Sequence, residues 1–203
     1  MIGFYRRFIG AGQKKPAAGK KAQRRAQKNG AKMAKEGRKE RTNDMAMHIV
    51  MVNPEIPPNT GNVARTCAAT GTCLHLVKPL GFSIDDRSLK RAGLDYWPYV
   101  RLFVHESLEE FLEEYEVKQG RRMFLATTKG GMMYTEPEYK DGDMILFGCE
   151  TKGLDREFIE ERKDRAIRIP MSEDTRLRSF NLANSVNIIL FEALRQQGFP
   201  GLE

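Results

Sequence analysis

The sequence lacks the features that define several large classes of protein. It has three cysteines in 203 residues, with no C-x-x-C pair and no metal-ligand spacing to its three histidines. This usage does not indicate a disulfide framework or a metal site, and we expect no metal and reduced thiols in a reducing compartment. No apolar run approaches the roughly 18 residues of a membrane-spanning helix, so we expect no membrane association.

Common catalytic and nucleotide-binding motifs are also absent. There is no G-x-G-x-x-G fingerprint and no G-x-x-x-x-G-K-[ST] phosphate loop. No Ser/His/Asp or Cys/His set surrounds His48, His75 or His105 in the sequence. We therefore interpret each histidine as a lone strand or loop residue without a catalytic role.

Acidic residues are missing from the first 35 positions, and the basic charge is concentrated there. Residues 1–44 contain 14 Lys and Arg against 3 acidic residues, a net charge of +11. The remaining residues contain 20 basic and 24 acidic side chains, a net charge of −4. Because residues 11–44 contain almost no apolar side chains to bury, we expect residues 1–44 to be a disordered extension of a folded domain at 45–203.

Three interpretations of this basic extension stay open. It can hold RNA phosphates through salt-sensitive contacts, it can be a solvated low-complexity segment, or it can be a targeting presequence. The apolar segment 1–10 with two Arg is partly typical of a transit peptide, but Ser is missing and Lys is abundant. We expect a cytoplasmic protein, with an organellar location as the alternative if the extension is a transit peptide.

The folded part alternates between strand and helix patterns. We expect apolar strands at 47–52, 74–77, 99–104, 123–127, 144–147 and 166–169, and helices at 61–70, 83–94, 107–117, 156–163 and 182–195. Asn59 or Thr60 would cap the first helix and Gly71 would end it. Nearly continuous apolar strands between helices predict an α/β domain with a mainly parallel sheet and helices on both faces.

Polar loops follow three of the predicted strands, at 127–131, 148–153 and 170–179. Ligands of parallel sheets gather at the carboxyl ends of strands, so these loops are candidate binding segments. From the end of the third loop onward, polar side chains gather at the start of the last helix, where free N–H groups suit a polar ligand: Ser179, Asn181, Asn184 and Ser185. The alternative interpretation is ordinary helix capping by Ser179 or Asn181.

Three blocks of sequence together resemble the SPOUT superfamily of RNA methyltransferases. They are the N-x-G-x-x-x-R element at Asn59, Gly61 and Arg65, the FGCETKGL block at 147–154, and the segment from IPM at 169–171 through SFNLANS at 179–185 and on to FEA at 191–193. PEIPPNTGN at 54–62, LVKPLGF at 76–82, KRAGLDYW at 90–97 and ATTKG at 126–130 resemble the branch that methylates the wobble ribose of tRNA. The similarity covers about residues 47–201, and residues 1–44 lie outside it.

The resemblance implies a fold, a methyl donor and partners. It implies a C-terminal trefoil knot, S-adenosylmethionine as donor, a homodimer, and tRNA as the substrate. Carried over position by position, the donor would contact Ala126, Thr127, Gly148, Glu150, Gly153, Ile169, Met171, Ser179 and Leu182. An rRNA 2′-O-methyltransferase, or a non-catalytic RNA-binding protein of the same fold, are the alternatives.

The resemblance also assigns the residues of methyl transfer to a ribose 2′-oxygen. Arg65 would assist the ribose hydroxyl, Asn59 would shape the loop before it, and Glu150, Ser179 and Asn181 would position donor and acceptor. Because an arginine keeps its proton at ordinary pH, Arg65 is better understood as holding a phosphate or stabilising a developing alkoxide than as a base.

Overall fold

The computed structural model describes residues 45–84, 96–174, 176 and 179–203. The strands are β1 (His48–Val52), β2 (Cys73–Val77), β3 (Arg101–His105), β4 (Met123–Ala126), β5 (Met132–Met133), β6 (Met144–Phe147) and β7 (Ala166–Arg168). The α-helices are α2 (Pro57–Thr70), α4 (Leu108–Leu112), α5 (Arg156–Glu161) and α6 (Leu182–Gln196). Two short 3₁₀ helices (Trp97–Tyr99 and Lys163–Arg165) and one π-helical segment (Glu113–Lys118) complete these elements.

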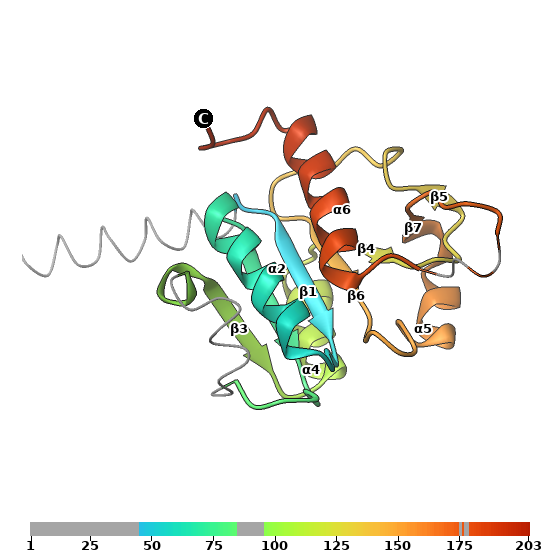
Figure 1. Cartoon of the computed structure of the whole chain (residues 1–203), viewed down its shortest axis with the longest axis horizontal. Coiled ribbons are helices and arrows are strands. Elements are labelled where there is room, and N and C mark those ends of the chain that lie inside the picture. The colour runs from blue at the N-terminus through green and yellow to red at the C-terminus, as the bar shows by residue number, and fades with distance from the viewer. Residues whose placement is uncertain (1–44, 85–95, 175, 177–178) are drawn as a thin grey trace, which may run out of the picture. The chain divides into compact units, whose positions relative to one another are not determined.

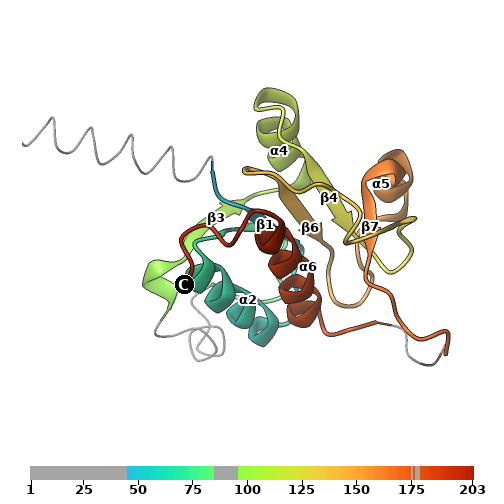
Figure 2. The same ribbon diagram turned by 90° about the horizontal axis from the view of Figure 1, so that it is seen from above.

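The seven strands form one sheet in the order β3-β2-β1-β6-β4-β7-β5. Every strand pair in the described part of the chain is parallel, which confirms the predicted α/β class. Alternate residues of β1 pack into two separate cores: Ile49 and Met51 face α2 and α6, whereas Val50 and Val52 face the side of α4 and α5. Figures 1 and 2 show these helix pairs on opposite faces of the sheet.

Helix α2 begins earlier than the sequence predicts. Pro57 and Pro58 occupy its first positions, where their fixed φ suits a helix and their missing N–H groups cost nothing. Ile56 is the N-cap residue and makes no side-chain capping bond, so the predicted cap at Asn59 or Thr60 is wrong. Gly71 ends the helix with a φ of 67°, as predicted.

Helix α6 packs against α2 and buries one continuous apolar face. Its buried residues are Ala183, Val186, Ile189, Leu190, Ala193 and Leu194. The Asn181 side chain caps the helix by accepting from the backbone N–H groups of Ala183 (2.9 Å) and Asn184 (3.4 Å). The predicted capping role of Asn181 is therefore confirmed, and Ser179 lies two residues before the cap.

Other boundaries differ in instructive ways. The predicted helix at 83–94 lies largely outside the described residues. Strand β5 is two residues long and was missed, because two residues do not produce a periodic pattern. Ser107 caps α4 by accepting from the N–H of Glu110, whereas the Glu110 carboxylate accepts from the N–H of Glu106 rather than from that of Ser107, so only half of a capping box forms. The predicted strand at 99–104 is β3, which starts two residues later.

The three histidines form a buried, hydrogen-bonded row across β1, β2 and β3. His48 Nδ1 lies 2.8 Å from His75 Nε2, and His75 Nδ1 lies 3.0 Å from His105 Nε2. The interpretation of each histidine as a lone residue is therefore wrong. The parallel register of neighbouring strands brings together side chains about 30 residues apart, which sequence spacing does not reveal.

Candidate functional site

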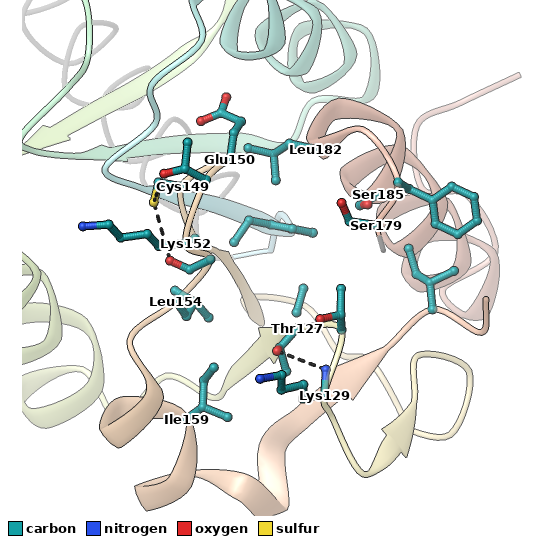
Figure 3. Close-up of a pocket in the computed structure, with 18 of the residues that line it drawn as sticks. Thr127, Lys129, Cys149, Glu150, Lys152, Leu154, Ile159, Ser179, Leu182 and Ser185 are labelled. Atoms are coloured by element: carbon teal, nitrogen blue, oxygen red, sulfur yellow. Dashed lines mark hydrogen bonds between the residues drawn. The ribbon is translucent and has the colours of Figure 1, made fainter. Parts of the chain in front are cut away.

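A cleft of about 830 Å³ opens at the carboxyl ends of β4, β6 and β7. These strands are neighbours in the sheet, so the loops that follow them lie together. Figure 3 shows side chains from the loops after β4 and β6 and from the region around the start of α6 around the same hollow. The three loops singled out from the sequence therefore meet at one site, which the parallel topology requires.

All nine positions carried over as donor contacts line this cleft. Ile169, Met171 and Leu182 supply apolar surface, with Phe147 and Leu154 beside them. Thr127 and Ser179 supply hydroxyl groups at its wall. The cleft therefore offers both apolar and polar contacts, as a binding site for an organic cofactor requires.

Gly148 permits the tightest backbone approach in the cleft. A Cβ atom built on Gly148 would lie 2.0 Å from the carbonyl carbon of Gly153 and 2.0 Å from the amide nitrogen of Leu154. The chain turns back on itself here, with the N–H of Gly153 donating to the carbonyl of Cys149 at 2.9 Å and Gly153 at a φ of 75°. The two glycines therefore determine the shape of the loop after β6.

Asn59, Glu150 and Asn181 form one hydrogen-bonded chain. The Asn59 Nδ2 donates to Glu150 Oε1 at 2.9 Å, and Asn181 Nδ2 donates to Asn59 Oδ1 at 2.9 Å. Because Glu150 can only accept, the Asn59 amide has a defined orientation. Three of the predicted site residues, from three distant segments, are thereby held together at the edge of the cleft.

Arg65 lies apart from this group. It is exposed on α2, and its guanidinium stacks on the ring of Tyr96 with 4.6 Å between the Cζ atom and the ring centroid. It does not line the cleft, whereas the other four predicted catalytic positions do. The structure therefore separates the arginine from the predicted donor contacts.

The structure adds cleft residues that the sequence reasoning did not name as site residues. Lys129, Lys152 and Arg156 bring three positive charges to the cleft, although the domain as a whole is acidic. Thr151 is also a lining residue, and it contacts Glu55 on the loop before α2. All of these residues except Arg156 lie in the sequence blocks that resemble the methyltransferase family. Their place in those blocks is the signal by which the sequence could have marked them as site residues.

No helix among the described residues is long and apolar enough to cross a membrane. Among the same residues no group of three or more His, Cys, Asp or Glu side chains is arranged to hold a metal ion.

Comparison with known proteins identifies the family. Residues 46–191 match the SpoU rRNA Methylase family. A curated relative, the tRNA (cytidine(34)-2′-O)-methyltransferase of Methylovorus glucosotrophus, is 49% identical over 154 residues, covering 75% of this chain and 97% of the relative.

Two solved structures are similar over most of the described domain. One, which concerns the 2-OH methylation of C/U34 on tRNA, has a TM-score of 0.68 and 44% identity, covering 76% of this chain and 98% of the other. The second is an AdoMet-bound rRNA methyltransferase from Sinorhizobium meliloti, with a TM-score of 0.67 and 25% identity, covering 75% of this chain and 57% of the other.

Proposed function

Because the chain belongs to the SpoU methylase family, we propose that it methylates the 2′-oxygen of the wobble nucleotide of tRNA with S-adenosylmethionine as donor. The proposal rests on one observation above all: the nine expected donor contacts, drawn from four separate segments, surround a single cleft. The choice of tRNA nucleotide 34 follows the relatives with 44% and 49% identity, which concern that position.

The lining of the cleft supports binding of the methyl donor. Ile169, Met171 and Leu182 offer apolar contact to an adenine ring, and the tight backbone at Gly148 allows main-chain groups to approach it closely. When bound, S-adenosylmethionine supplies a sulfonium methyl group for in-line transfer to an oxygen. The similar rRNA methyltransferase from Sinorhizobium meliloti holds the same compound, which supports this assignment.

The other roles in methyl transfer fall to side chains in and near the cleft. Glu150 and Asn181 already use polar atoms in the hydrogen-bonded chain with Asn59, so they act by fixing the loops around the cleft. Ser179 stands at the cleft wall, where its hydroxyl can orient the donor or the ribose. Arg65 keeps its positive charge, and we assign it to a phosphate or to the developing alkoxide of the ribose.

We also propose that the protein works as a homodimer through the α2–α6 face. Phe191 on α6 and Ile56 before α2 remain 46% and 43% exposed beside a face that is already packed. Sedimentation at micromolar concentration should give a dimer, and a fully active monomer would contradict this.

The family also implies a trefoil knot, which we retain as a proposal. Strand β7 lies between β4 and β5, so the connection from β4 to β5 must pass β7. A Cβ atom built on Gly130 in that connection would lie 2.7 Å from the carbonyl carbon of Ile167. This close crossing supports a threaded arrangement of the cleft loops.

The extension at 1–44 lies outside the described residues. We propose a cytoplasmic enzyme whose extension contacts tRNA phosphates, with a transit peptide as the alternative.

Transfer of a tritiated methyl group tests the activity directly. The purified full-length protein is incubated with labelled S-adenosylmethionine and either bulk tRNA or rRNA, and the modified nucleotide is mapped by mass spectrometry. We expect label in tRNA at nucleotide 34. A matched tRNA that already carries a 2′-O-methyl group at that nucleotide should take up no label. Label only in rRNA would show that rRNA, and not tRNA, is the substrate. Donor binding without transfer to either RNA would indicate a non-catalytic protein.

A further inference from the structure

Two carboxylates join the loop before α2 to the loop after β6 in a reciprocal way. Glu150 accepts from the backbone N–H groups of Glu55 at 2.8 Å and Ile56 at 3.2 Å. In return, Glu55 accepts from the backbone N–H of Thr151 at 3.2 Å and from its hydroxyl at 3.0 Å. Each loop therefore supplies an acidic side chain that binds the backbone of the other.

The Glu55 backbone is also fixed from another side. The N–H of Gly81 donates to the carbonyl of Pro54 at 2.9 Å, and a Cβ on Gly81 would lie 2.7 Å from the Cα of Glu55. Pro57 and Pro58 follow at once and start α2 with fixed φ angles. The segment before α2 is thus rigid, and its side-chain contacts determine where the helix begins relative to the cleft.

The contact brings two acidic side chains to adjoining loops, and this choice of residues points to a use beyond stability. Glu55 and Glu150 are both carboxylates on adjoining loops, and like charges at neighbouring positions repel. Neutral side chains could join two loops without that repulsion. Local arrangements that run against electrostatic preference tend to occur at functional sites.

We propose that Glu55 and Thr151 are positioning residues that set the placement of α2, and with it Arg65, relative to the donor loop after β6. Helix α2 is continuous from Pro57 to Arg65, a rise of about 12 Å at 1.5 Å per residue, so a shift at its start moves the guanidinium. A misplacement of about 1 Å can cost on the order of 100-fold in rate. This inference rests on the proposed methyl transfer.

Paired variants separate positioning from binding and from folding. Glu55→Gln leaves a side chain of the same size but removes the charge, and it retains one acceptor oxygen for the two Thr151 donors, so that the Thr151 hydroxyl must turn from donor to acceptor. Thr151→Val removes the hydroxyl but keeps the β-branched shape. Thr151→Ser restores the hydroxyl and serves as the conservative rescue. Glu138→Gln is the matched control, since the exposed Glu138 side chain pairs with Lys140 at 3.5 Å and the substitution keeps the backbone carbonyl that accepts from Arg122.

The readouts are the single-turnover rate of methyl transfer at saturating donor and tRNA, the donor Kd by calorimetry, and Tm. We expect Glu55→Gln and Thr151→Val each to lower the rate about tenfold or more, with donor Kd within about threefold. Thr151→Ser should recover most of the rate, and Glu138→Gln should match the wild type. The double variant should lose less than the product of the single losses, because the two residues act through one contact.

Three outcomes would overturn the inference: unchanged rates in both variants, parallel losses of rate and donor affinity, or no recovery with Thr151→Ser. If Glu55→Gln does not fold, Thr151→Val and Thr151→Ser decide the question between them. Failure of the proposed function is seen separately, because then the wild-type protein itself transfers no methyl group to tRNA.

Discussion

The guanidinium of Arg65 lies over the ring of Tyr96, with its Cζ atom 4.6 Å from the ring centroid. Such a stack is worth about 0.5–1 kcal/mol at an exposed site, enough to favour one orientation of a long side chain. It also leaves the in-plane N–H groups of the guanidinium available to a phosphate or an alkoxide. Tyr96 therefore orients in advance the Arg65 guanidinium, to which we assign a role in methyl transfer.

We expect Arg65→Ala to lower the transfer rate by about 100-fold or more, with donor Kd within a few fold, because the residue is outside the cleft. Rates and calorimetric titrations measure both quantities. Tyr96→Leu should give a smaller loss through disorder of Arg65, and Tyr96→Phe, which keeps the ring, is its control. If Arg65→Ala lost donor affinity to the same extent as transfer rate, Arg65 would belong to the donor site instead.

Gly148→Ala should abolish measurable donor binding. The added Cβ would lie 2.0 Å from the Gly153–Leu154 backbone, so the loop must open. We also expect a stability loss of roughly 1–3 kcal/mol, as for overpacking elsewhere. Gly131→Ala is the matched control, because a Cβ there meets nothing within 4 Å. Calorimetry with S-adenosylmethionine and urea unfolding test both statements, and normal binding by Gly148→Ala would refute our account of the cleft.

The histidine row makes stability depend on pH. Burial lowers the pKa of His75 well below 6.5, and the neighbouring His48, His105 and Arg121 act in the same direction. Burial also lowers the pKa of His105, against the opposing charge of Glu110. The unfolded chain therefore binds more protons as pH falls below about 6.5, and the folded state loses stability there. The expected slope approaches about 1.4 kcal/mol per pH unit for each such proton.

Urea unfolding between pH 7.5 and 5.0 measures this slope. Tyr115, whose ring lies against His75 and His105, stays neutral in that range because burial raises its pKa. A free energy of unfolding that is constant or rises on acidification would contradict the buried, neutral state of the row.

The contact between Arg121 and His48 predicts which ring nitrogen of each histidine carries the proton. Its guanidinium lies 3.3 Å from His48 Nε2 and can only donate, so His48 must carry its proton on Nδ1. His75 then accepts from His48 at Nε2 and donates from Nδ1 to Nε2 of His105, so the neutral His105 ring also carries its proton on Nδ1. Nitrogen NMR at neutral pH should show three neutral Nδ1–H rings. A ring that carries its proton on Nε2 would contradict this direction of hydrogen bonding along the row.

Deletion of residues 1–44 tests the charged extension. The extension carries a net +11 and the rest of the chain −4, so tRNA binding at low salt should weaken. Each lost phosphate contact removes roughly 0.7–0.9 from the slope of log affinity against log salt, and we expect the slope to flatten by several units. Donor affinity and the methylated nucleotide should stay the same. An unchanged slope would favour a targeting or idle segment, and a changed nucleotide would show that the extension takes part in recognition.

The buried strands and the cleft loops were predictable because their signals are local. The apolar runs of β1, β2 and β6 are buried at every position, as strands covered on both faces must be. The loop after β6 was recognisable from its glycines and its block of sequence. The start of α2 was misjudged because Asn59 and Thr60 are good cap residues, whereas the two prolines begin the helix one turn earlier.

What sequence reasoning missed depends on contacts between distant segments. The histidine row arises from strand register, and the Glu55–Thr151 contact joins residues 96 positions apart. Neither residue of that pair has a periodic pattern that would mark it. Arg65 and Tyr96 were both in recognised blocks, but only the folded chain shows that they stack.

The bond between Asn59 and Asn181 spans 122 positions, and this has a consequence for biosynthesis. Because translation adds roughly 5–20 residues per second, Asn181 is synthesised about 6–24 s after Asn59. Strands β1 and β2 are close in sequence and can pair in that interval, but the wall formed by α6 is absent. A nascent chain that stalls before α6 has no closed cleft for the methyl donor, so the enzyme becomes competent only when its last helix is complete.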